Sequence, residues 1–246
     1  VLDKNEAPSM EDQVRSILEN SIKKTRAGDS LPFYDEDKDQ THVFELVSQA
    51  PEPGIFEVVA CSGHVVVRDA VLNYERVDVY TLTVRVTDNG IDDPILKGTP
   101  YYNGAPMFDT ASVSVTIVDV NEAPIFDNLG VPYARTVPEN SLKGTLIDTP
   151  VVASDPDTKA VDPLWRALSY SIETGNAAGI FVVEIISGQI AVETPQLDYE
   201  TVPSYDIGYK ASDSGTPPLF TSTFVRVTVL DINEPPVVVA MEGQID

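Results

Sequence analysis

The stretch that decides the fold is Asp119–Pro124, which reads DVNEAP. Near copies stand at residues 3–8 (DKNEAP) and 231–236 (DINEPP), 116 residues before it and 112 residues after it. Four more motif pairs follow in the same order: LEN and PEN, DED and DPD, LNYE and LDYE, and VTDNG and ASDSG. The members of the first two pairs lie 120 residues apart, and those of the last two lie 125 apart. The chain is therefore an internal duplication with a unit of roughly 115 residues.

Within each unit, apolar and polar residues alternate with a period of two. Residues 80–86 (YTLTVRV) follow this pattern. In each of two further runs, three alternate apolar residues share one face: Val113, Val115 and Ile117 in the first run, and Val225, Val227 and Val229 in the second. Such alternation predicts half-buried strands, and the Gly, Pro, Asn and Asp residues between the runs predict turns. Residues 11–24 resemble a helical pattern, but the equivalent segment contains Pro138, which argues against a helix. We therefore predict an all-β chain with one sandwich per unit.

The composition narrows the classes of function. A formal net charge of −23 argues against binding to nucleic acid or to an anionic membrane surface, and it favours cations. The single cysteine, Cys61, stands in the stretch ACSGHVVV, for which we predict a buried, inert thiol. We find no signal peptide and no apolar run long enough to cross a bilayer. Because the chain starts and stops inside the repeated motif, we expect it to be an excerpt of a longer protein.

The recurring acids and amides have the chemistry of a calcium site. They offer oxygen ligands only, and calcium takes six to eight oxygens, many of them from carboxylates and carbonyls. In the DxD and DxN spacings, alternate side chains of an extended segment point the same way, so two oxygens can reach one ion. Solvated loop acids would explain any single one of these residues, but an ordered set that occurs twice favours a cation.

The combination of DVNEAPIF, PEN, ASDPD, LDYE and ASDSGTPPL resembles the signature of cadherin extracellular repeats over nearly the whole chain. This resemblance implies two tandem Greek-key sandwiches of seven strands each, joined end to end, with about three calcium ions in the join. It also implies repeats at 8–118 and 125–230 and a calcium-binding linker at 119–124. Residues 1–7 would end a preceding linker, and residues 231–246 would form a linker and the start of a following repeat.

Carried over position by position, the resemblance implies a central site and two partial sites. The central ligands would be Glu19, Asn73, Glu75, Asp119, Asn121, Glu122, Asp155, Asp157 and Asp213, with the backbone carbonyls of Val120 and Ala123. A partial site at the start would use Asp3, Asn5, Glu6, Asp35, Asp37 and Asp88. A partial site at the end would use Glu139, Asp198, Glu200, Asp231, Asn233 and Glu234.

This sequence departs from the family pattern in four places. Asn73 replaces the usual Asp, which removes one charge and weakens the outermost ion. Glu122 and Ala123 replace the common Asp-Asn. The loop 158–168 departs from the usual Gly-x-Asn pattern, so its carbonyl ligand cannot be placed. Residues 91–107 form an insertion in the first repeat, which we expect to be the place to test for a partner.

These features predict a fragment of a calcium-dependent cell-adhesion protein, in which internal repeats act as a cation-stiffened extracellular spacer. The expected partners are neighbouring repeats of the same chain and another cadherin, homophilic or heterophilic, with no direct membrane contact by this fragment. The expected location is the extracellular region of a single-pass cell-surface protein.

Two other readings stay open or are disfavoured. A carbohydrate- or matrix-binding cadherin-like module is the alternative, with Trp165 and the Tyr101-Tyr102 pair as its candidate platforms, although packing of Trp165 on the sandwich is favoured. An enzyme is not expected, because the acids lie in joins and because His42 and His64 are isolated with no nucleophile motif beside a base.

Overall fold

The computed structural model describes residues 4–68, 71–90, 104–160 and 162–236. It divides into two compact units, Val1–Val120 and Asn121–Asp246. The strands of the first unit are β1 (Gln13–Leu18), β2 (His42–Ala50), β3 (Phe56–Val58), β4 (Val65–Val67), β5 (Val79–Asp88) and β6 (Phe108–Val118). The second unit has β7 (Tyr133–Pro138), η1 (Pro163–Arg166), β8 (Ser169–Thr174), β9 (Phe181–Val183), β10 (Ile190–Val192), β11 (Ser204–Ser212) and β12 (Phe220–Leu230).

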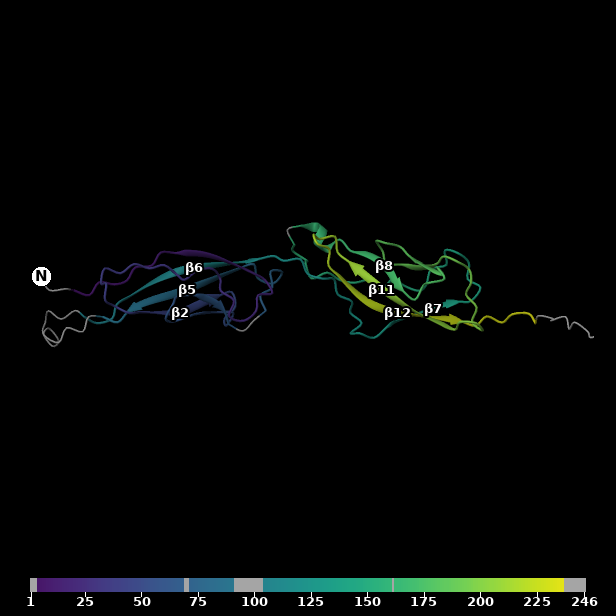
Figure 1. Cartoon of the computed structure of the whole chain (residues 1–246), viewed down its shortest axis with the longest axis horizontal. Helices are drawn as coiled ribbons and strands as arrows, with labels where there is room; N and C mark the ends of the chain where they lie inside the picture. The colour runs from purple at the N-terminus through teal and green to yellow at the C-terminus, as the bar shows by residue number, and fades with distance from the viewer. Residues whose placement is uncertain (1–3, 69–70, 91–103, 161, 237–246) are drawn as a thin grey trace, which may run out of the picture. The chain divides into compact units, whose positions relative to one another are not determined.

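Each unit contains a four-stranded sheet and a two-stranded sheet. In the first unit the larger sheet has the order β1-β6-β5-β2, and β3 pairs with β4. Figure 1 shows β6, β5 and β2 of this sheet side by side. In the second unit the larger sheet has the order β7-β12-β11-β8, and β9 pairs with β10. β1 and β7 run parallel to their partners, and the other pairs are antiparallel. The chain leaves the larger sheet after β2, forms the smaller sheet, and returns to pair β5 beside β2, as expected for a Greek key.

A further segment of each unit completes the smaller sheet. In the first unit Lys24 N donates to Val67 O at 2.8 Å and Ala27 N donates to Val65 O at 2.9 Å. The second unit repeats these bonds 120 residues later, with Gly144 N donating to Val192 O at 2.8 Å. Each segment contains one isolated bridge, so it continues the ladder without forming a regular strand. The six regular strands of each unit, together with this segment, make up the seven strands per repeat that the family resemblance implied.

Each unit has its own apolar core, and the two cores share no residue. The alternation predicted from the sequence is confirmed, because the predicted inner-face residues are at most 1% exposed: Leu82, Val84, Val86, Val113, Val115, Ile117, Val225, Val227 and Val229. Residues 11–24 contain strand β1 and no helix, as Pro138 in the equivalent segment predicted. None of the described residues lies in a helix long and apolar enough to cross a membrane.

The prediction that Cys61 is buried is wrong, because its side chain is exposed. Cys61 lies in the turn between β3 and β4, where Ser62 N and Gly63 N both donate to Val59 O, at 3.1 and 2.8 Å. The chain reverses over these residues, so the side chain at the tip of the turn faces solvent. Gly63 has a φ of 67°, and a Cβ there would lie 2.9 Å from the ring of Phe44, so the turn requires glycine.

We expect the Leu82→Ala variant to destabilise only the first unit. Leu82 is fully buried, and truncation of a buried leucine costs about 2–5 kcal/mol of unfolding free energy. In chelator, calorimetry should show one transition moving down while the transition of the second unit stays in place. Val14→Ala, at a site that is 74% exposed, is the control and should move neither transition. Equal movement of both transitions in Leu82→Ala would contradict two separate cores.

Candidate metal centres

Glu19 and Glu139 hold the same position in the two units. Each follows the first strand of its unit and is buried, with exposures of 2% and 3%. The Glu19 carboxylate accepts hydrogen bonds from Tyr74 N and Val120 N, both at 2.8 Å. Glu139 accepts from Tyr199 N at 2.9 Å and from Ile232 N at 2.7 Å. Each glutamate therefore ties the end of its strand to the LNYE or LDYE turn and to the chain that leaves the unit.

The next residue explains how the chain turns at this point. Asn20 and Asn140 have φ angles of 57° and 55°, in the left-handed region that asparagine tolerates better than most residues. The asparagine of the LEN and PEN motifs therefore ends the strand and leaves the preceding glutamate facing the end of the sandwich.

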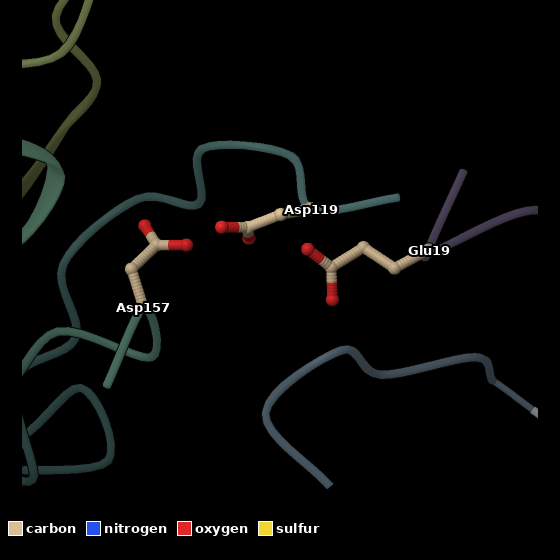
Figure 2. Close-up of side chains that lie close together, drawn as sticks. All are labelled: Glu19, Asp119 and Asp157. Carbon is tan, nitrogen blue, oxygen red and sulfur yellow. The ribbon is translucent and has the colours of Figure 1, made fainter. Parts of the chain in front are cut away.

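Further carboxylates gather around each of these glutamates. In the first unit, Glu75 and Asp119 each have an oxygen within 4.8 Å of a Glu19 oxygen, and Figure 2 shows the side chains of Glu19 and Asp119 close together. In the second unit, oxygens of Glu139, Glu200 and Glu234 lie within 4.8 Å of one another. Like charges at this distance repel, and the repulsion grows as water is excluded.

The exposed Glu200 responds to these neighbours. A hydrogen bond from its own backbone lowers its pKa, but desolvation and the charges of Glu139, Asp231 and Glu234 outweigh that bond and raise the pKa above the ordinary value for Glu. The cluster at this end of the second unit is therefore one in which negative charge is unfavourable without a cation.

At its other end, the second unit gathers the remaining predicted ligands. Glu122 N donates to Asp157 Oδ2 at 2.9 Å, and Asp157 N donates to Asp155 Oδ1 at 3.0 Å. Asn121 Nδ2 donates to Asp213 Oδ2 at 2.9 Å. Asp157 is fully buried and Asp213 is 3% exposed. The structure thus brings together, within one unit, five of the residues that the sequence predicted.

The loop after β11 is shaped to let the linker amide approach. Gly215 N and Leu219 N both donate to Asp213 Oδ1 at 2.9 Å. A Cβ on Gly215 would lie 2.7 Å from Asn121 Nδ2 and 2.8 Å from Asn121 Oδ1. Only glycine leaves room for Asn121 beside Asp213, which explains the last residue of the ASDSG motif.

Three oxygens in this group are buried and have no hydrogen-bond partner: Asn121 Oδ1, Asp155 Oδ2 and Asp157 Oδ1. An unpartnered buried carboxylate oxygen is costly, so such atoms indicate a missing ligand. Because every donor is an amide or carboxylate oxygen, the group fits a hard cation such as Ca²⁺.

Burial and like charge also shift the acidity of this pair of aspartates. The pKa of Asp157 is raised to about 6. Burial is the largest cause, and a hydrogen bond with Asp155 and the charges of Asp155 and Glu122 act in the same direction, against the hydrogen bond from Glu122 N. Burial also raises the pKa of Asp155, with the charges of Asp213 and Glu122 acting in the same direction. Both shifts mean that the ionised form is disfavoured in the absence of a counter-ion.

The first unit repeats this backbone geometry at its own start. Glu6 N donates to Asp37 Oδ2 at 3.0 Å, and Asp37 N donates to Asp35 Oδ1 at 2.9 Å. Gly90 N donates to Asp88 Oδ1 at 2.7 Å, and Asn5 Nδ2 lies 3.5 Å from both Asp88 oxygens. Asp3, the remaining predicted ligand of this partial site, lies outside the described residues.

Two residues here were not predicted to belong to the site. His42 Nε2 lies 2.7 Å from Asp35 Oδ2, so the expectation that His42 is isolated is wrong. Gln40 Nε2 donates to Asp37 Oδ2 at 3.1 Å and also to Asn5 Oδ1. Neither residue belongs to a repeated motif; the only signal was their closeness in sequence to the DED pair. His64 lies elsewhere, with Nδ1 2.9 Å from Ser62 Oγ.

Asn73 and Asp198 organise their own turns. Asn73 Oδ1 accepts a hydrogen bond from Arg76 N at 2.7 Å. Asp198 Oδ2 accepts from Thr201 Oγ1 at 2.6 Å, and this bond lowers the pKa of the exposed Asp198 carboxyl. A coordinating role for either residue stays a prediction, as it does for Asn233 and for the carbonyls of Val120 and Ala123.

The candidate binding platforms gain no support as a site. Trp165 lies in the short helix η1 and is half-buried, and Asp162 caps that helix by accepting from Leu164 N at 2.9 Å. Tyr101, Tyr102 and most of the insertion 91–107 lie outside the described residues.

Comparison with known proteins agrees with this geometry. The family model described as Cadherin domain matches residues 133–230. The human Cadherin-related family member 2 is 31% identical over 214 residues, which is 83% of this chain. Rat Cadherin-23 is 34% identical over 205 residues, or 81% of this chain. The crystal structure of mouse Cadherin-23 EC22-24 matches 94% of this chain and 66% of its own, with a TM-score of 0.59 and 26% identity. The chain belongs to the cadherin superfamily.

The resemblance stated from the motifs is thereby confirmed, with tandem cadherin repeats as the architecture. The cadherin chain spans only a small part of its curated relatives, 15% of Cadherin-related family member 2 and 6% of rat Cadherin-23. Human Protocadherin Fat 1 is 32% identical over 184 residues, and the chain covers 4% of it. The relatives therefore establish the kind of module and not the activity of a whole protein.

The acidity of Asp157 predicts how cation-free stability depends on pH. A raised pKa contributes stability that is present below the unfolded value near 4 and is lost as the pH rises through about 6. In chelator, the melting temperature of the second unit should therefore fall between pH 5 and pH 7.5. Asp157→Asn should reduce this fall and raise the melting temperature at pH 7.5 by several degrees, on the order expected for ~1 kcal/mol.

Asp78→Asn in the first unit removes an exposed acid and is the control for general charge. If the two variants have the same pH dependence of melting, burial of Asp157 does not perturb its ionisation.

Proposed function

We propose that this chain is a calcium-stiffened segment of the extracellular rod of a cadherin-type adhesion protein. The observation that carries the proposal is the group of buried, unpartnered oxygens on Asn121, Asp155 and Asp157, directly after the end of the first repeat. At that end of the first repeat, the carboxylates of Glu75 and Asp119 lie close to that of Glu19. One peptide bond, between Val120 and Asn121, connects the two groups.

The residues that would hold calcium are those predicted for the central join, and about three ions would offset their seven negative charges. When bound, the cation supplies positive charge shared by ligands from both repeats. The chain's own residues hold the carboxylates in place through backbone N–H groups, so the ligand positions exist before binding. The partial sites at the two ends would serve neighbouring repeats in the same way.

The expected setting follows from the family. Its members named above include cadherins and a protocadherin, and we propose that this segment lies outside the cell as part of a cell-surface protein. Its proposed partners are the adjacent repeats of its own chain and another cadherin. The boundaries 8–118, 119–124 and 125–230 are proposed as the repeat, linker and repeat.

Calcium titration tests the proposal. With a dissociation constant near ~10⁻⁴ M, 1 mM calcium stabilises each site by about 1.4 kcal/mol. The melting temperature should rise with calcium, and small-angle scattering should show a narrower distribution of solution shapes than in chelator. Magnesium at the same concentration is the control, since it prefers six ligands in a tight octahedron and keeps its water. If calcium changes neither the melting curve nor the scattering profile, the proposal is refuted.

The substitution Asn73→Asp should tighten calcium binding. Asp198 occupies the equivalent turn in the second repeat, so the first repeat should accept an aspartate at the same place. One additional unit charge about 4 Å from a divalent ion contributes about 2 kcal/mol in water, which corresponds to about thirtyfold in affinity. Isothermal titration calorimetry measures this change, and Asn103→Asp, in the insertion, is the control for net charge. Unchanged affinity would mean that residue 73 does not reach the ion.

A further inference from the structure

The two repeats present the same acidic motif in two different states. At the start of the second repeat, Asn121 Oδ1, Asp155 Oδ2 and Asp157 Oδ1 are buried without hydrogen-bond partners. The equivalent residues of the first repeat are Asn5, Asp35 and Asp37, and none of their oxygens is buried without a partner, although Gln40 Oε1 beside them is. The backbone bonds are the same in both repeats. Asp37 differs from Asp157 because it is half-buried and Asp157 is fully buried. The difference at Asn5 and Asp35 comes from the side chains that contact them.

Gln40 and His42 account for the difference. Gln40 Nε2 reaches both Asn5 Oδ1 and Asp37 Oδ2, and His42 Nε2 lies 2.7 Å from Asp35 Oδ2. This contact is sheltered, with the His42 side chain 12% exposed and the Asp35 side chain 4% exposed. The His42 ring also lies against Phe33, with centroids 4.5 Å apart, which fixes its orientation.

Among the described residues of the second repeat, the position equivalent to His42 carries no such donor. His42 pairs with Asp88 in the register of β2 and β5. In the second repeat Ser169 pairs with Ser212, so the position opposite Asp213 belongs to Leu168. Leu168 is half-buried against the core and carries no donor. Both histidines of the chain lie in the first repeat.

We propose that Gln40 and His42 act as internal substitutes for a cation and make the start of the first repeat a weak calcium site, unlike the start of the second. An ion there must displace two donors that the fold holds in place, whereas at the second repeat it meets oxygens with nothing to displace. The chain would then have unequal joints, with a stiff central one and a preceding one that depends less on calcium. This inference rests on the proposed function, since it assumes that the second repeat binds calcium.

A single calcium titration of the ¹⁵N-labelled full chain, followed by NMR, compares the two sites. The amides of Glu6 and Asp37 report on the first repeat, and those of Glu122 and Asp157 report on the second, because they make equivalent hydrogen bonds. In the unmodified chain, Glu122 and Asp157 should shift at calcium concentrations at least tenfold lower than Glu6 and Asp37.

Variants separate the effect of Gln40 and His42 from other differences between the two sites. His42→Leu introduces the residue type found at the equivalent position, and Gln40→Ala changes a loop residue. Each should lower the calcium concentration at which Glu6 and Asp37 shift by several-fold, and the double variant by about tenfold. His64→Leu, whose imidazole contacts Ser62 in another turn, is the matched control and should leave all four amides unchanged.

The outcomes are distinguishable. If His42→Leu weakens binding at Glu6 and Asp37, the imidazole orients Asp35 as a ligand and the inference is overturned. Variants that leave the midpoints of Glu6 and Asp37 unchanged overturn it as well. If Glu122 and Asp157 do not respond to calcium at all, the proposed function itself fails. Should His42→Leu fail to fold, Gln40→Ala alone still decides, since its side chain lies on a loop.

Discussion

The constraint on which the rest depends is that backbone N–H groups hold carboxylates close together at the ends of each sandwich. Glu19 accepts hydrogen bonds from two segments that lie far apart in sequence, and Glu139 repeats the arrangement. These hydrogen bonds hold the two carboxylates in position, and they also hold the backbone segments that donate them. The like charges therefore cannot relieve their repulsion by moving apart, and only a counter-charge or protonation can relieve it.

The sandwich delivers the acids to these ends by its ordinary strand geometry. Val84 and Val86 face the core of the first repeat, and the next inward position of β5 is Asp88, which is 4% exposed. In the second repeat Tyr209 and Ala211 face the core, and the next inward position is Asp213. A strand with a period of two thus places a carboxylate at the edge of the core, where the interior ends and a cation can still enter. Stability of the fold and placement of the ligands come from one pattern.

The sequence alone predicted the features that occur in both repeats, but it did not predict the features that occur in only one of them. The offsets of 120 and 125 residues aligned the two repeats, and alternation identified the buried faces of β5, β6 and β12 correctly. Cys61 was assigned wrongly because an apolar neighbourhood does not show where a turn exposes its tip. The contact of His42 with Asp35 was missed because the two residues meet through a loop whose length and sequence differ from those of its counterpart in the second repeat. A pattern predicts which face a residue occupies, but its partner depends on packing.

The linker shows why modest cation affinity can be enough to stiffen the joint. Val120 N is bonded to Glu19 of the first repeat, and Glu122 N is bonded to Asp157 of the second, so a single residue, Asn121, separates the two anchors. Fixing the backbone of one residue costs about 1–2 kcal/mol in entropy. Ordering Asn121 therefore costs about 1–2 kcal/mol, which is less than the gain from the three proposed sites of about 1.4 kcal/mol each. A longer flexible linker would require tighter sites, so under the proposed function the shortness of this linker would allow calcium sites of modest affinity to control the joint.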